Sequence, residues 1–173
     1  MNIDLLLGIL DISPFDWHAI AAAVLCGSIV GLERQLRGKP VGIRTAALIT
    51  LGTYLFLATA FNLPGTTVDP TRVVGQVITG IGFLGAGVML AKDGAVVGVT
   101  SAATIWVLAS LGVMISAGHL GASYKMALLV VAILYGAEQL EARTRTFSRG
   151  VHSRVVHYAR RKQPKRSENE VVE

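Results

Sequence analysis

Residues 45–68 read TAALITLGTYLFLATAFNLPGTTV, a run of 24 positions without a charged side chain. A helix of roughly 20 residues, rising about 1.5 Å per residue, crosses the apolar core of a bilayer, so this run is long enough to span a membrane. Two further uncharged runs follow at residues 73–91 and 94–118. Shorter or less apolar candidates lie at residues 17–32 and 119–137. The sequence therefore predicts about five membrane-spanning helices.

The composition agrees with a membrane protein. Charged residues make up 16% of the chain, against roughly 25% in an average soluble domain, and the mean hydropathy is +0.56. This excludes a soluble globular domain and predicts an all-α, polytopic transmembrane helix bundle. We expect an extracytoplasmic or interfacial N-terminal segment (residues 1–16), a five-span membrane domain (17–140) and a basic cytoplasmic tail (141–173). The single cysteine, Cys26, lies in an apolar run, where a packing role is expected.

Lys and Arg are distributed unevenly among the expected loops. With five spans, 14 of the 16 Lys and Arg residues fall on one side. Because the cytoplasmic side of a membrane retains basic loops, this predicts an N-terminus outside and a C-terminus inside. A six-span alternative that uses the apolar residues 5–12 moves the N-terminus inside and leaves the other loops unchanged.

A stripe of small residues follows one face of the segment 73–91. Its members recur at spacings of four, three and four: Gly75, Thr79, Gly82 and Ala86. The same segment contains Gly80, Gly85 and Gly87. Small residues let helix backbones approach closely in lipid, so we expect this small-residue stripe to pack against a neighbouring helix. The glycines also weaken a helix, which leaves open a broken span whose free carbonyls bind an ion.

Motifs for catalysis and metal binding are not convincing in this chain. The glycines at positions 80, 82 and 85 match G-x-G-x-x-G, but a dinucleotide site needs a preceding strand and an acidic residue about 20 positions later. The four histidines are scattered. We therefore expect no enzyme activity, no metal site and no cofactor. Basic residues flank apolar segments and do not interleave with aromatic ones, which favours anionic lipids at the tail over nucleic acid.

Charged residues gather where the first span ends. Glu33 and Arg37 are spaced i,i+4 with the acid first, which is the favourable order for an ion pair on a helix. The span is short, so Glu33 and Arg34 lie at or inside the headgroup level, and Arg44 follows a tight turn at residues 39–42. We expect Glu33 to pair with Arg37 or Arg44. A functional charge cluster and a simple interfacial anchor both remain open.

The fourth expected span contains polar side chains. The hydroxyl groups of Thr100, Ser101 and Thr104 can bond to backbone carbonyls or to a neighbouring helix. Trp106 lies deeper than the usual aromatic belt, so we expect its indole N–H to have a partner inside the bundle. These groups act either as polar contacts between helices or, with the third-span glycines, as the wall of a polar pocket.

Four stretches in order resemble signatures of the MgtC/SapB family of membrane proteins. They are GLER at residues 31–34, KPVGIRT at 39–45, QVITGIGFLGAG at 76–87 and GVTSAATIW at 98–106. The resemblance covers about residues 19–137. It implies a bacterial inner-membrane protein with a role in growth at limiting magnesium and, in pathogens, in survival inside macrophages.

The resemblance implies two candidate functions. The first is a non-enzymatic modulator of other membrane machinery, docking on a partner protein or forming a homodimer. The alternative is a small oligomeric transporter or channel for Mg²⁺, although the acids near the spans all lie at span ends: Glu33, Asp69, Asp93 and Glu138. Two departures from the family pattern stand out. The residues after Glu141 are too few for the soluble ACT-like domain of many members, and Ala46 stands where the family often has His.

Overall fold

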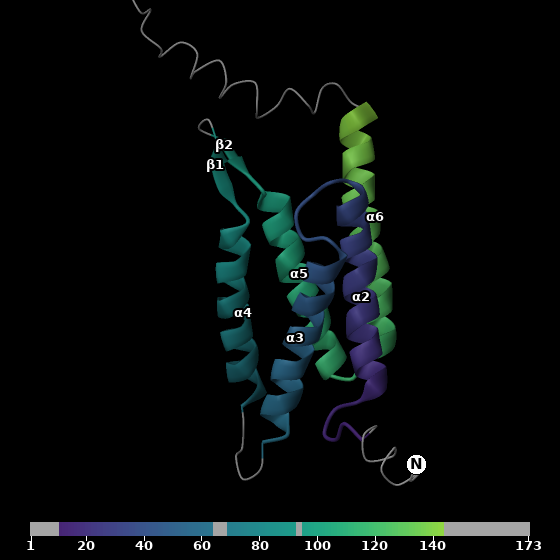
Figure 1. Ribbon diagram of the computed structural model, residues 1–173, viewed down its shortest axis with the longest axis vertical. Coiled ribbons are helices and arrows are strands. Elements are labelled where there is room, and N and C mark those ends of the chain that lie inside the picture. The colour runs from purple at the N-terminus through teal and green to yellow at the C-terminus, as the bar shows by residue number, and fades with distance from the viewer. Residues whose placement is uncertain (1–10, 64–68, 93–94, 144–173) are drawn as a thin grey trace, which may run out of the picture.

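The computed structural model describes residues 11–63, 69–92 and 95–143. This part of the chain forms five helices and one β-hairpin (Figure 1). The helices are α2 (Trp17–Leu36), α3 (Ile43–Phe61), α4 (Pro70–Gly87), α5 (Val99–Ser116) and α6 (Leu120–Arg143). The antiparallel hairpin, β1 (Leu90–Lys92) and β2 (Ala95–Val97), joins α4 to α5. Successive helices run in opposite directions, which confirms the expected all-α bundle (Figure 1).

Four helices are long and apolar enough to cross a membrane: α2, α3, α5 and α6. The expected span at residues 73–91 is wrong in its bounds, because α4 ends at Gly87 and the chain continues into β1. Helix α4 begins with Pro70, includes Arg72 and is not among these four. It still runs beside α5 over much of the height of the bundle (Figure 1). That the chain crosses the membrane five times stays a prediction.

The two ends of the chain are described in part. Residues 11–16 precede α2, and the rest of the expected N-terminal segment lies outside the described residues. Helix α6 continues to Arg143, beyond the expected boundary at residue 140, so the tail expected from residue 141 begins inside this helix. Residues 144–173 lie outside the description, and the expectation that this tail binds anionic lipid stays a prediction.

Short-range signals set the helix starts. The Asp16 carboxylate accepts hydrogen bonds from the backbone N–H groups of His18 and Ala19 and thereby caps α2. The His18 N–H is the main reason that the pKa of Asp16 lies below its usual value, so the cap stays negatively charged beside the helix N-terminus. Asp69 caps α4 in the same way through the N–H of Thr71, and Pro70 occupies the first helical position.

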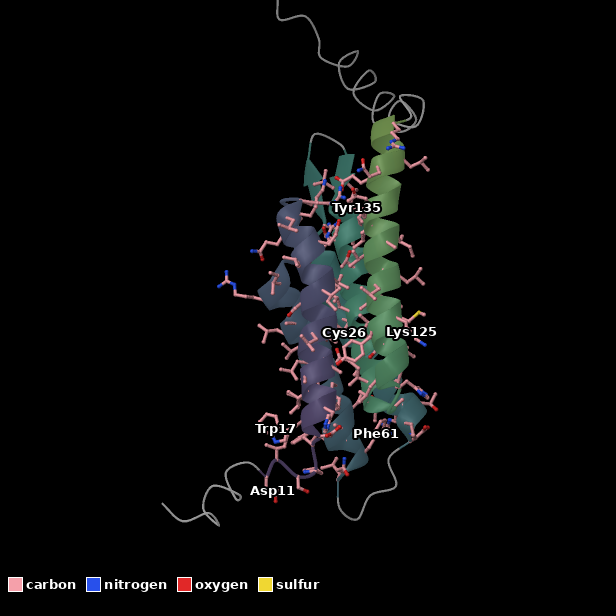
Figure 2. All side chains as sticks on the ribbon, turned by 90° about the vertical axis from the view of Figure 1, so that its right-hand side faces the viewer. Asp11, Trp17, Cys26, Phe61, Lys125 and Tyr135 are labelled. Atoms are coloured by element: carbon pink, nitrogen blue, oxygen red, sulfur yellow. The ribbon has the colours of Figure 1, made fainter. Side chains whose placement is uncertain are left out.

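The interior of the bundle lies where α2 packs against α3, α5 and α6. Cys26 and Val30 of α2 and Leu108 and Leu111 of α5 form the centre of this core and are almost completely buried. The Cys26 thiol lies 3.8 Å from the hydroxyl of Ser123 on α6, and Figure 2 shows Cys26 at this junction. The packing role that was expected for Cys26 agrees with this position.

The closest helix contacts are made by glycines of α2 and α5. A Cβ atom on Gly27 would lie 2.7 Å from the carbonyl oxygen of Ala46 on α3, and one on Gly31 would lie 2.7 Å from Ile43 Cα. On α5, a Cβ on Gly112 would lie 2.6 Å from the carbonyl oxygen of Thr50. Gly27 and Gly31 form a G-x-x-x-G pair, the pattern that allows close helix approach in lipid.

The small-residue stripe of α4 does not make the contacts expected of it within the chain. Cβ atoms on Gly75, Gly80, Gly82 and Gly87 would meet nothing within 4 Å. Gly85 is the exception among the α4 glycines, since its Cβ would lie 3.7 Å from Ala102 of α5. Packing between α4 and α5 uses another face of the helix. Helix α4 is also continuous through these glycines, so the broken-span alternative is wrong for this chain.

We predict that Gly27→Ala destabilises the fold by about 1–2 kcal/mol. Overpacking costs typically about 1–3 kcal/mol, and the gain in helix propensity offsets up to about 1 kcal/mol of it. Gly82→Ala is the matched control, because it brings the same gain in propensity and has open space around its Cβ. Thermal unfolding in detergent checks this. Equal melting temperatures for the two variants would contradict the assignment of the α2–α3 contact.

Candidate functional site

The last turn of α2 places three charged side chains at one end of the bundle. We call this the basic end: it is where α2 ends, α3 begins and the β-hairpin lies, at the top of Figure 1. Arg37 Nε lies 2.7 Å from Glu33 Oε1, which confirms the expected i,i+4 ion pair. The Glu33 side chain is buried and that of Arg37 is half-buried. The pair therefore lies at the edge of the interior, where solvent screens it less than on an open helix surface.

Arg37 also connects α2 to α6. Its Nη1 pairs with Glu138 Oε2, and Lys39 Nζ lies 3.7 Å from Glu138 Oε1. The guanidinium carbon of Arg37 lies 4.7 Å from the centre of the Tyr135 ring, a cation–π contact. Figure 2 shows Tyr135 near the upper end of α6. These side chains hold α6 against the α2–α3 turn, and we call them the Arg37 cluster: Glu33, Arg37, Lys39, Tyr135 and Glu138.

Arg34 points to a different helix. Its Nη2 donates a hydrogen bond of 2.9 Å to the hydroxyl of Ser101 on α5, and both residues are buried. The α2 terminus is thereby joined to α5 by Arg34 and to α6 by Arg37.

The buried charges are incompletely hydrogen-bonded. Within the described part of the chain, neither carboxylate oxygen of Glu33 receives a well-directed hydrogen bond, and neither does Arg34 Nε donate one. The short Arg37–Glu33 distance is thus an electrostatic contact without good hydrogen-bond alignment. Buried ionisable groups of this kind are costly and are commonly functional. Surrounded by cations, the Glu33 carboxylate is suited to holding charged side chains in place and poorly suited to binding a metal ion.

Arg44 does not join the cluster. It is exposed in the first turn of α3, and in the part of the chain that the structure describes it forms no ion pair. The expected alternative pair between Glu33 and Arg44 is therefore not formed. The cluster instead includes Glu138 of α6, which pairs with Arg37. Sequence reasoning noted Glu138 as an acid at a span end, but its partner was not predictable because the two residues lie 101 positions apart.

Ser101 and Thr104 of α5 bond to other protein groups. Ser101 binds Arg34, and the hydroxyl of Thr104 donates to the carbonyl of Thr100 within the same helix at 2.8 Å. Trp106 is 51% exposed, so the expected indole partner inside the bundle is wrong. It lies outside because the buried face of α5 passes through positions 101, 104, 105 and 108. The hydroxyls of Ser101 and Thr104 thus make polar contacts between helices and within α5, and their role in a pocket wall stays a prediction.

A groove of about 710 Å³ lies between α3 and α4. It is predominantly apolar, and Gln76 and Gly80 of α4 take part in it. We call it the α3–α4 groove. Its α3 wall is formed by Thr45, Leu48, Ile49, Gly52, Thr53 and Phe56. The α4 wall is formed by Val73, Gln76, Val77, Gly80, Ile81 and Leu84.

The described residues contain no group of three His, Cys, Asp or Glu side chains that could hold a metal ion. Among the side chains that the structure describes at the basic end, the carboxylates of Glu33 and Glu138 are both paired with Arg37. The chemistry of this end is therefore the pairing of fixed charges between helices.

Comparison with known proteins matches residues 20–143 to the model of the MgtC family. The chain is 43% identical over 113 residues to "Putative magnesium transporter YhiD" of Escherichia coli K12, covering 61% of this chain and 52% of that protein. It is 36% identical over 114 residues to "Protein MgtC" of Brucella abortus (strain 2308), covering 66% and 48%, respectively. It is 38% identical over 122 residues to "Protein MgtC" of Salmonella typhimurium (strain 14028s), covering 70% and 50%.

The match covers about half the length of each of these relatives. The match to the family model, residues 20–143, falls on α2 to α6. It therefore includes the basic end and the small-residue stripe. No solved structure matches the chain.

We predict that Arg37→Gln lowers the stability of the bundle more than Glu33→Gln does. Losing Arg37 leaves the buried Glu33 without its counter-charge, at a cost of about 1–2 kcal/mol, below the about 3–5 kcal/mol of a fully buried pair. Glu33→Gln removes an incompletely bonded charge and leaves Arg37 paired with Glu138. Thermal unfolding of both variants in detergent decides the order, and the reverse order would show that Glu33 is the residue that holds the cluster together.

Proposed function

The chain belongs to the MgtC family, and from this premise we propose that it is a non-enzymatic membrane protein that modulates other membrane machinery during growth at low magnesium. It resides in the bacterial inner membrane, as a homodimer or bound to another membrane protein. The names of its relatives, all bacterial, and its four apolar helices support this proposal.

The observation that carries the proposal is the open small-residue stripe of α4. All of its residues except Gly82 are exposed, Gly82 is half-buried, and the positions of Gly75 and Gly82 have open space beyond the backbone. The equivalent small positions in α2, Gly27 and Gly31, are in backbone contact with α3. A stripe of small residues that the described part of the chain leaves largely exposed is suited to a helix of another chain, because close backbone approach drives helix association in lipid.

The charge arrangement fits a modulator better than an ion path. A Mg²⁺ site uses carboxylate and carbonyl oxygens and keeps several waters. In the helices, the acids lie near the basic end, and Glu33 and Glu138 there are engaged by Arg37. Helix α4 is continuous, so its carbonyls are used in its own hydrogen bonds. The alternative function is transport, which the printed name of the E. coli relative suggests for that protein.

Gly82→Leu tests the proposed docking face. We expect the variant to keep the wild-type melting temperature, because a side chain at this position meets open space. The variant should no longer associate with a second copy of the chain or with a partner protein. Cross-linking in membranes measures this association. The variant should also fail to restore growth at limiting Mg²⁺ in a strain that lacks the native protein. Gly136→Leu on α6 is the matched control, since its surroundings are also open.

Restoration of growth by Gly82→Leu to the wild-type extent would refute the docking face. Proteoliposomes that contain the purified protein alone test the alternative function. We expect no Mg²⁺ flux above that of protein-free vesicles. Saturable Mg²⁺ flux would refute the modulator proposal and show that the protein is a transporter, whatever the growth assay shows.

Glu33→Gln tests whether the charge cluster is functional or serves only as an anchor. We expect normal abundance in the membrane, because the substitution removes one buried charge from the span and makes insertion easier. Growth at limiting Mg²⁺ should be lost, because the charge pattern at the basic end changes. Immunoblots of membranes quantify abundance beside the growth assay. Full growth at normal abundance would exclude the cluster from the functional site.

A further inference from the structure

We propose that the α3–α4 groove holds an acyl chain of an anionic phospholipid whose headgroup is bound by Arg44. The groove lies on an exposed side of α3, a helix that is long and apolar enough to cross a membrane. Its volume of about 710 Å³ falls within the about 300–1,000 Å³ typical of pockets that bind small ligands. Lipid is the surrounding medium at this surface, so its chains reach the groove without a further opening.

The groove has the length of one leaflet. Its α3 wall extends from Thr45 to Phe56, which is about 16 Å at the rise of an α-helix. Half of a bilayer core is about 15 Å thick. The α3 and α4 walls together consist mainly of aliphatic and aromatic side chains, with a gap at Gly52, where a Cβ would meet nothing within 4 Å. An acyl chain lying along α3 therefore reaches from the headgroup level to about the middle of the membrane.

Arg44 lies at the basic end of this groove. It precedes Leu48, a lining residue, by four positions, so the two side chains share a face of α3. Its neighbours in the sequence, Arg37 and Lys39, are paired with Glu138, whereas Arg44 has no ion pair within the described residues. Arg44 lies in the first turn of α3, whose first N–H, that of Ile43, donates to the uncharged Gln35 side chain, so no acidic cap offsets the charge of Arg44 there. A cation beside an apolar groove at headgroup level matches an anionic lipid.

A protein helix fits this groove less well than it fits the small-residue stripe. Gly80 lines the groove, and Gly82 lies about 200° farther around α4, so the groove and the stripe are on different faces. The groove presents bulky side chains such as Phe56, which is 72% exposed, and not a row of small residues. The two faces of α4 thus serve different ligands, and the lipid proposal does not depend on the proposed docking function.

The test is native mass spectrometry of the full chain released from mild detergent, in the presence of phosphatidylglycerol or of zwitterionic phosphatidylethanolamine. We expect Arg44→Gln to reduce retained phosphatidylglycerol about fivefold, the effect of one Lys or Arg near an anionic lipid surface, and to leave phosphatidylethanolamine unchanged. Gly52→Leu should reduce retention of both lipids, because the new side chain occupies the groove. Lys125→Gln, an exposed cation on α6 that does not line the groove, and Gly136→Leu should leave both unchanged.

Melting temperatures show whether Gly52→Leu is folded, and the exposed Arg44 gives an independent test if it is not. Wild-type retention of phosphatidylglycerol in Arg44→Gln would overturn the assignment of the headgroup site. A change in the dimer fraction of Gly52→Leu with wild-type lipid retention would identify the groove as a protein interface and overturn the proposal. An equal loss of phosphatidylglycerol in Lys125→Gln would show that net charge alone causes the effect and would also overturn the proposal.

Discussion

The backbone contact between α2 and α3 at Gly27 and Gly31 is the constraint on which the rest of the bundle depends. Lipid tails are as apolar as Leu side chains, so helices in a membrane gain little from hydrophobic association and rely on close packing and polar contacts. The Cβ distances at both glycines show that α2 and α3 lie as near as two helices can. The end of α2 and the beginning of α3 are therefore fixed relative to each other, and a short turn connects them.

Once α2 is fixed, its last turn determines how the other helices are held at the basic end. Arg34 reaches Ser101 on α5, and Arg37 reaches Glu138 on α6. Two cations three positions apart on one helix thus bind two different neighbours. The buried Glu33 carboxylate pairs with Arg37 and offsets its charge where solvent is largely excluded. Such an arrangement is most sensitive to the loss of Arg37, because this residue pairs with both Glu33 and Glu138.

Helix α4 differs from the others because it lies at the edge of the bundle. It packs mainly on α5, with Gly85 against Ala102, and has weaker contacts with α3 (Figure 1). Its remaining surface is therefore available to the surroundings. One face carries the small-residue stripe and another lines the α3–α4 groove, so a single peripheral helix presents one surface suited to a protein helix and one suited to lipid.

The sequence by itself determined the fold class, the pairing of Glu33 with Arg37 and the existence of a small-residue face on α4, because uncharged runs and i,i+4 spacing are local properties of the chain. It also contained the Gly27–Gly31 pair, a readable signal that was overlooked beside the richer glycines of α4. Tertiary structure decided which glycines are covered, that Glu138 and not Arg44 joins Glu33 and Arg37, and that Trp106 faces outward. Those outcomes depend on the rotation of each helix about its axis and on contacts between residues far apart in the sequence, which small and polar residues permit but do not specify.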